Sequence, residues 1–172
     1  MYLSQEQYEF LLKPINPARV GKDGKGFAHL EAWDVRRVLI GVFGYTGWSA
    51  DILNMEMIFE TEGTGRSGNP AWTVAYRACC RLTIGDCTYT EWAAGDATNY
   101  PSRADAHDQA MKTAESQAFK RCAVNLGDAF GLSLYDGGSR AQSVRATLDR
   151  SAYLLKEDYT AATTAEENTD AS

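Results

Sequence analysis

The sequence predicts an α+β domain: an antiparallel β-meander packed on one long helix, with short helices near the N-terminus. Three observations favour this class. Residues 48–60 and 72–84 alternate between apolar and polar side chains, which is the period of a strand with one buried face. A Gly-Asp turn then leads into a third strand-like segment at 88–95, as in a hairpin. Residues 102–130 carry small apolar side chains at helical spacing, which indicates a long helix lying close to the sheet.

The length of 172 residues suits one domain with its own hydrophobic core. No apolar run is long enough to span a bilayer, and the first residues lack the features of a signal peptide. We therefore expect a cytoplasmic protein that binds no membrane. The net charge is −6, but residues 151–172 hold five of the 23 acidic residues and one of the 17 basic residues, which leaves 18 and 16 in residues 1–150. A nucleic-acid site would therefore be a local basic track.

The first quarter of the chain predicts two short helices joined by a basic loop. Ser4 and Gln7 form a capping-box pattern, and Pro14 ends the helix that follows. Residues 27–30 indicate a brief strand, and residues 31–43 a helix that ends at Gly44. The loop lacks the spacing of an ATP-binding loop and is typical of a solvated segment that can touch a nucleic-acid backbone. Its cations are Lys13, Arg19, Lys22 and Lys25.

The meander and the long helix each present one apolar face. The second strand, Trp72–Ile84, places Arg77 and Arg81 on its polar face. The long helix begins at Ser102, a favourable N-cap. The first strand, Trp48–Glu60, is predicted to be half-buried through Leu53, Met55, Met57 and Phe59. The apolar stripe of the helix consists of Met111, Ala114, Ala118, Cys122, Leu126 and Ala129.

Cysteines and aromatic residues favour structural roles, and no cofactor site is expected. Cys79 and Cys80 are adjacent on a strand and would point to opposite faces, and no CxxC pair occurs. We therefore expect buried thiols in a reducing compartment rather than a zinc site. The large aromatic residues are expected in the core or at a subunit interface rather than as platforms for bases. They are Trp33, Tyr45, Trp48, Trp72 and Trp92.

Residues 29–138 resemble the Rad52 single-strand annealing family of eukaryotes and its phage and bacterial relatives. The resemblance rests on short strings in a fixed order. A Phe-Gly-Tyr-Thr-Gly-Trp string starts at Phe43, after a short helix. The meander follows, with Arg81 before the Gly-Asp turn and a Tyr-x-Glu strand after it. The last string closes the long helix: Lys120-Arg121, then Gly127 and Gly131.

The resemblance implies that the domain is one protomer of a closed homo-oligomeric ring. Single-stranded DNA would lie in a basic groove around this ring, with phosphates inward and base edges outward. The implied activity is ATP-independent annealing of complementary strands in recombination and repair. Lys120 and Arg121 match the family's basic pair that grips the DNA backbone in this inner groove.

The chain departs from the family at four further cation positions. Two arginines of the inner groove fall at Val124 and Asp34, although Arg36 and Arg37 follow the latter within a turn. One lysine of an outer site falls at Gly85, and another falls near Pro101, with Arg103 two residues on. The candidate DNA-binding residues are therefore Lys120, Arg121, Arg36, Arg37, Arg81, Arg77, Arg103 and Lys25.

Four of these eight cations have an alternative as members of ion pairs. Lys120 and Arg121 could pair with Glu115 or Asp128 at helical spacing. Across the sheet, Arg77 and Arg81 could pair with Glu56 or Glu91.

Two other function classes stay open. Four acids on neighbouring strands could hold the divalent ions of a nuclease, although the absence of a paired-acid motif or a nearby histidine favours a protein that is not an enzyme. They are Asp51, Glu56, Glu91 and Asp96. A ring-forming scaffold that recruits recombination partners fits the net charge. We expect the annealing domain over residues 1–138. Over 139–172 we expect a weak helix at 146–156 and a disordered acidic tail that binds a partner protein.

Overall fold

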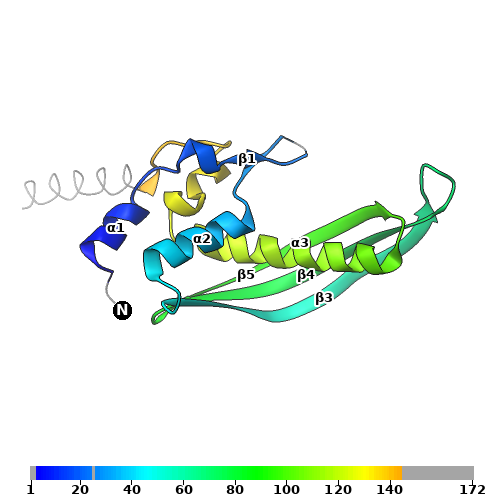
Figure 1. The fold of residues 1–172 in the computed structure, drawn as a ribbon, viewed down its shortest axis with the longest axis horizontal. Coiled ribbons are helices and arrows are strands. Elements are labelled where there is room, and N and C mark those ends of the chain that lie inside the picture. The colour runs from blue at the N-terminus through cyan, green and yellow to red at the C-terminus, as the bar shows by residue number, and fades with distance from the viewer. Residues whose placement is uncertain (1–2, 25, 145–172) are drawn as a thin grey trace, which may run out of the picture.

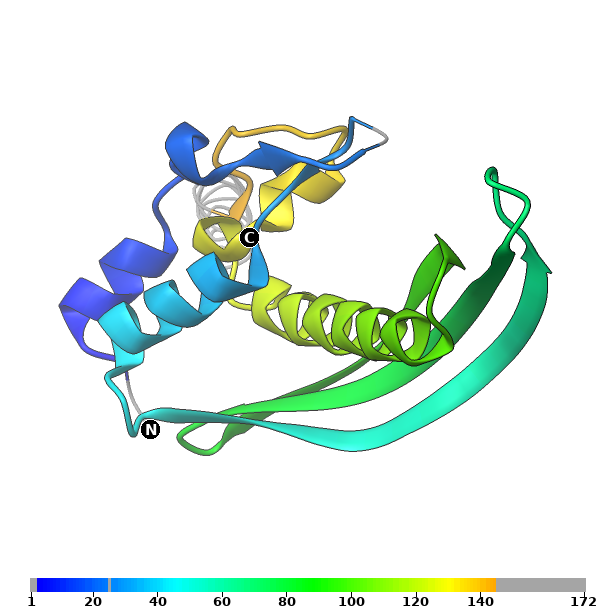
Figure 2. The same cartoon turned by 45° about the vertical axis from the view of Figure 1, so that its right-hand side comes forward.

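The structure, a computed structural model, describes residues 3–24 and 26–144. A curved antiparallel sheet with the strand order β3-β4-β5 carries helix α3 along one face, and shorter elements gather at one end of it (Figure 1, Figure 2). The strands are β3 (Trp48–Thr64), β4 (Pro70–Ile84) and β5 (Cys87–Tyr100), and α3 spans Arg103–Val124. The α+β class and the antiparallel meander predicted from the sequence are confirmed.

The shorter elements pack against one another and against the C-terminal end of α3. Helix α1 begins with the predicted capping box, because the Ser4 hydroxyl accepts from Gln7 N and the Gln7 side chain accepts from Ser4 N. Strand β2 is the brief strand predicted over 27–30, and it pairs with β1 as a hairpin. These elements are α1 (Gln5–Leu11), η1 (Pro17–Arg19), β1 (Gly21–Lys22), β2 (Ala28–His29), α2 (Ala32–Phe43), η2 (Asp128–Phe130) and η3 (Leu132–Tyr135).

Helix α3 lies unusually close to the sheet, as its alanines predict. A Cβ atom added to Gly95 in β5 would lie 2.3 Å from Ala114 N and 2.7 Å from Thr113 Cβ, so only glycine fits there. The alanines that face the sheet are fully buried: Ala106, Ala110, Ala114 and Ala118. The backbone of α3 therefore packs directly on β5 at Gly95.

The long helix ends earlier than the sequence predicts. Its pattern indicates a helix as far as Phe130, but α3 ends at Val124 and the chain continues in the 3-10 turns η2 and η3. Gly127 and Gly131 adopt φ angles of 101° and 95°, a region that glycine enters without strain and that a helix cannot use. The two glycines therefore turn the chain out of the helix axis, and η2 packs against α1.

Strand β3 is more exposed than the predicted half-buried strand. Its pairing with β4 shifts register at two bulges, between Ile52 and Asn54 and between Met57 and Phe59, which breaks the period of two. Because α3 packs mainly on β4 and β5, the apolar side chains of the edge strand β3 lack a cover. The exposed ones are Ile52, Leu53, Met57, Ile58 and Phe59, whereas Met55 is half-buried.

The last described residues fold back on the domain. The buried Asp128 carboxylate accepts hydrogen bonds from Ser143 N at 2.7 Å and Val144 N at 3.1 Å. The predicted helix at 146–156 and the acidic tail lie outside the described residues, and the domain boundary at 138 stays a prediction. Among the described helices, none combines the length and hydropathy that a membrane crossing requires.

Candidate nucleic-acid interface

A groove runs between the β1–β2 hairpin and α3. Its volume is about 480 Å³, and a smaller cavity of about 140 Å³ adjoins it and shares Ala28, His29, Gln117, Lys120 and Tyr135 with it. We call the two together the Lys120 groove. The hairpin side is formed by Asp23, Phe27 and His29, and the helix side by polar residues of α3. Those on α3 are Gln109, Lys112, Thr113, Ser116, Gln117 and Lys120.

Lys120 is the half-buried cation of this groove. Burial lowers the pKa of its ammonium group, while the carboxylate of Glu31 acts in the opposite direction. Among residues 3–24 and 26–144, Lys120 forms no salt bridge, and the predicted alternative partners Glu115 and Asp128 are engaged elsewhere. An ammonium group that has lost part of its hydration on burial is stabilised by direct contact with an anionic ligand.

Arg121 points to a different side of α3. Successive helical residues are about 100° apart around the axis, and Arg121 Nη2 lies 3.6 Å from Glu91 Oε2 on β5. Half of its side chain is exposed. Lys120 and Arg121 therefore do not form one clamp, although both lie in the last two turns of α3.

Arg36 lies beside a second cavity, of about 340 Å³, between α2, β3 and α3. Its guanidinium is 3.2 Å from Glu115 Oε1 and stacks over Phe119 at 4.4 Å from the ring centroid. Tyr45 and Trp48 also line this cavity. Glu115, which the sequence predicted as an alternative partner of Lys120, therefore pairs with Arg36 instead. Arg36 does not line the Lys120 groove.

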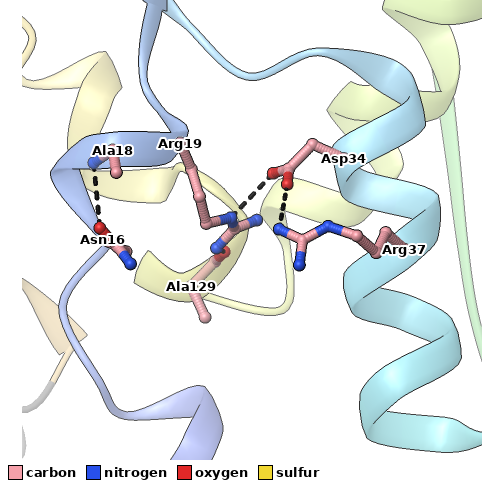
Figure 3. A network of polar contacts seen from close by, with 6 residues as sticks. All are labelled: Asn16, Ala18, Arg19, Asp34, Arg37 and Ala129. Atoms are coloured by element: carbon pink, nitrogen blue, oxygen red, sulfur yellow. Dashed lines mark hydrogen bonds and ion pairs between the residues drawn. The ribbon is translucent and has the colours of Figure 1, made fainter.

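Arg37 belongs to a buried ionic network that the sequence did not reveal (Figure 3). Asp34 is 3% exposed and binds Arg37 through Oδ1 and Arg19 through Oδ2, the latter at 2.8 Å. Arg19 also donates to the Ala129 carbonyl oxygen at 2.7 Å. The prediction of Arg19 as part of a solvated loop is wrong, because its side chain is only 12% exposed. An aspartate on the apolar face of a helix was the available signal, since a buried carboxylate needs a cation.

Arg77 and Arg81 lie on the sheet face opposite α3, far from the Lys120 groove. Arg77 pairs with Glu56 at 2.5 Å and stacks over Trp92, which confirms one predicted ion pair. Arg81 lies 3.7 Å from Asp51, because Glu91 is on the helix side of the sheet. A role of these two arginines in DNA binding stays a prediction.

Arg103 stands at the opposite end of α3 from Lys120, about 25 Å along the helix. It pairs with Glu60 at 2.8 Å and stacks over Trp72. His107 bonds to the same carboxylate and to Tyr76. The hydrogen bond from Arg103 lowers the pKa of Glu60. The remaining candidate, Lys25, lies outside the described residues.

The four acids proposed for a nuclease do not converge. Asp51, Glu56 and Asp96 face away from α3, whereas Glu91 faces it. Across the described parts of the chain, no group of three histidine, cysteine or acidic side chains is placed to hold a metal ion.

The cysteines and aromatic residues differ in part from their predicted structural roles. Cys87 is exposed, unlike the other three thiols. Trp33, Tyr45 and Trp92 are 65%, 85% and 44% exposed, so the prediction of a core position is wrong for these three. A subunit interface stays open for them.

The comparisons with known proteins agree with the resemblance. The Rad52/22 family of double-strand break repair proteins matches residues 5–152. The chain is similar to the DNA repair and recombination protein RAD52 of Kluyveromyces lactis, with 32% identity over 69% of this chain and 26% of the relative. RAD52 of Saccharomyces cerevisiae is 31% identical over 69% of this chain and 24% of its own length. Protein rad22 of Schizosaccharomyces pombe is 27% identical over 77% of this chain and 30% of its own length. This chain thus spans less than a third of each of these relatives.

Proposed function

Because the chain belongs to the Rad52/22 family of double-strand break repair proteins, we propose that it binds single-stranded DNA in the Lys120 groove and anneals complementary strands without ATP. The relatives' names place them in DNA repair and recombination. The proposed activity needs ordered strands and no bond chemistry, so it calls for no catalytic residue or cofactor. A cytoplasmic location and a phage or bacterial type stay predictions from the sequence.

The position of Lys120 carries the proposal. Of the candidate cations in the described part of the chain, six are in salt bridges and Lys120 is not. Its amine is half-buried in a groove, where a phosphate would replace the water that burial removes. Contacts with phosphates do not depend on the base sequence, and an annealing protein requires binding of this kind.

Two exposed aromatic residues border the same groove. Phe27 is 68% and Tyr135 is 67% exposed, one on the hairpin and one in η3. Aromatic faces beside a backbone-binding cation suit single-stranded DNA, because unpaired bases can stack on them whatever their identity. Double-stranded DNA would offer no free base face at this place.

A closed ring of copies is the second part of the proposal. Strand β3 presents an unpaired edge and five exposed apolar side chains, a combination that isolated domains normally avoid. The other edge, β5, also lacks a neighbour among the described strands. A head-to-tail contact between unlike edges closes into a ring when the rotation from one copy to the next is a whole fraction of a full turn. Repetition of one weak groove around that ring would give strong binding although each protomer is nearly neutral.

The direct test is the affinity for a fluorescent single-stranded oligonucleotide of mixed sequence, measured by anisotropy at low salt. We expect Lys120→Ala with Arg121→Ala to weaken binding at least about tenfold and to leave the oligomer size unchanged. The control removes two exposed arginines that line neither cavity of the groove, Arg66→Ala with Arg140→Ala, and should change affinity little. Equal affinities of wild type and the groove variant would refute the placement of the DNA.

A further inference from the structure

Two buried thiols lie against each other between α3 and β4. Cys122 comes from the last turn of α3 and Cys80 from β4, and neither side chain is exposed to solvent. The Cys122 thiol donates to the Cys80 carbonyl oxygen, with Sγ at 3.2 Å from that oxygen. A further hydrogen bond between the two thiols lowers the pKa of Cys122 and raises the pKa of Cys80. The two sulfur atoms are therefore in contact where the helix packs on the sheet.

The other two cysteines lie outside this contact. Cys79 is the neighbour of Cys80 on an extended strand, so its side chain lies on the opposite face of the sheet. Cys87 begins β5 after the turn that follows β4, and it is exposed. Cys80 and Cys122 are thus the thiol pair that the fold brings together.

We propose that Cys80 and Cys122 form a redox-modification site, at which a small hydroperoxide such as hydrogen peroxide converts the two thiols into a disulfide between α3 and β4. The peroxide first oxidises one thiol to a sulfenic acid, and its second oxygen leaves as water. The other thiol then attacks the sulfenic sulfur, and the hydroxyl group leaves with the proton of that thiol as a second water. A reducing thiol restores both cysteines, so in a reducing compartment the bridge is transient.

The surroundings of the pair give a small oxidant a slow route to it. Cys80 lines the cavity of about 340 Å³ beside Arg36. Cys122 lies two residues before the end of α3 at Val124, and helix ends open locally at a lower cost in free energy than packed helix centres. Because Cys87 is exposed, it should react with peroxide before the buried pair.

The bridge holds the basic end of α3 on the sheet. Lys120 and Arg121 directly precede Cys122 in the same part of the helix. The two cysteines are 42 residues apart in the sequence, and a covalent link across a loop of this length lowers the conformational entropy of the unfolded chain. Oxidation therefore stabilises the fold. This effect requires no DNA, so the inference can fail while the proposed function stands.

The test treats the full chain, as wild type and as Cys87→Ser, with a few equivalents of hydrogen peroxide at neutral pH and maps the cysteines by mass spectrometry without reduction. We expect a peptide pair linked through Cys80 and Cys122 and lighter by two hydrogen atoms than the free peptides together. Dithiothreitol should separate the pair. The thermal midpoint of Cys87→Ser should rise by roughly 5–15 °C on oxidation and return on reduction.

Two further variants separate the bridge from other oxidation products. Cys122→Ala removes one partner and should show neither the linked peptides nor the rise in the midpoint. Cys79→Ala is the matched control, because it removes a buried thiol of the same strand outside the pair, and it should show both.

Each outcome decides the inference. Recovery of Cys80 and Cys122 as free thiols in wild type whose Cys87 is oxidised overturns it, and so does their conversion to sulfinic acids without a link. A link that forms and lowers the midpoint overturns the stabilising role of the bridge. The mapping of wild type requires no substitution, so it decides the question even if Cys122→Ala is unfolded.

Discussion

Arg19 Nε donates to Asp34 Oδ2 at 2.8 Å, and both side chains are almost withdrawn from solvent. The pair joins η1 to α2, and the second bond of Arg19 to the Ala129 carbonyl adds η2 (Figure 3). Three segments that are distant in sequence thus meet at the guanidinium of Arg19. Because α2 and η2 both adjoin the Lys120 groove, this network holds the groove in shape.

Removal of the Asp34 carboxylate should lower the free energy of unfolding. Asp34→Ala leaves the Arg19 charge buried without a negatively charged partner, and we expect the free energy of unfolding to fall by about 3 kcal/mol. Urea denaturation followed by circular dichroism measures this change. Asp108→Ala, which breaks an exposed pair with Lys112, should cost less than about 1 kcal/mol. Equal losses in the two variants would show that the Arg19–Asp34 pair has no special role.

The charge of Lys120 should lower the stability of the fold and raise the affinity for single-stranded DNA. Because burial lowers its pKa, the folded state carries a charge that its surroundings solvate poorly. Lys120→Met keeps much of the side-chain volume and removes that charge, so the thermal midpoint should rise while single-stranded DNA affinity falls about tenfold. Thermal unfolding and anisotropy on one preparation check both. A lower midpoint with unchanged affinity would mean that Lys120 is a structural residue.

A fall in pH should destabilise the fold by protonating Glu60, which lies at the end of the sheet away from the Lys120 groove. The hydrogen bond from Arg103 lowers the pKa of Glu60 below its ordinary value of 4.5 in the folded state. A carboxyl whose pKa is lower in the folded than in the unfolded state stabilises the fold above the unfolded value, and this contribution is lost as pH falls through the folded value. Glu60→Gln should therefore reduce the loss of stability between about pH 5 and pH 3. Glu62→Gln on the same strand is the control, and an identical acid response of all three proteins would contradict the assignment.

The two bulges of β3 offer a test of the ring. Leu53 and Ile58 lie at the register shifts and are 46% and 52% exposed. Leu53→Lys with Ile58→Lys adds two charges to the edge and should dissociate the oligomer into monomers, as seen by light scattering after size exclusion. Thr61→Lys with Thr64→Lys adds the same charges to exposed polar positions of that strand and serves as the control. An oligomer that withstands the first change assembles through another surface.

The sequence predicts local features of this fold well and the meeting of distant segments poorly. The capping box at Ser4, the stop at Gly44 and the alanine row of α3 depend on neighbours a few residues away, and all three are confirmed. The Arg19–Asp34 pair and the groove between His29 and Lys120 arise only when the hairpin, α2 and α3 pack together. The exposure of β3 depends on which strands α3 covers, and periodicity contains no information on that.

The rate at which two complementary oligonucleotides pair, followed by fluorescence quenching without ATP, tests the central claim most directly. We predict that the protein accelerates pairing well above the rate of the protein-free strands. Lys120→Ala with Arg121→Ala should lose most of this acceleration, and rising salt should reduce it because bound cations are released from DNA when the protein binds. A pairing rate equal to that of the protein-free strands at low salt would contradict the account.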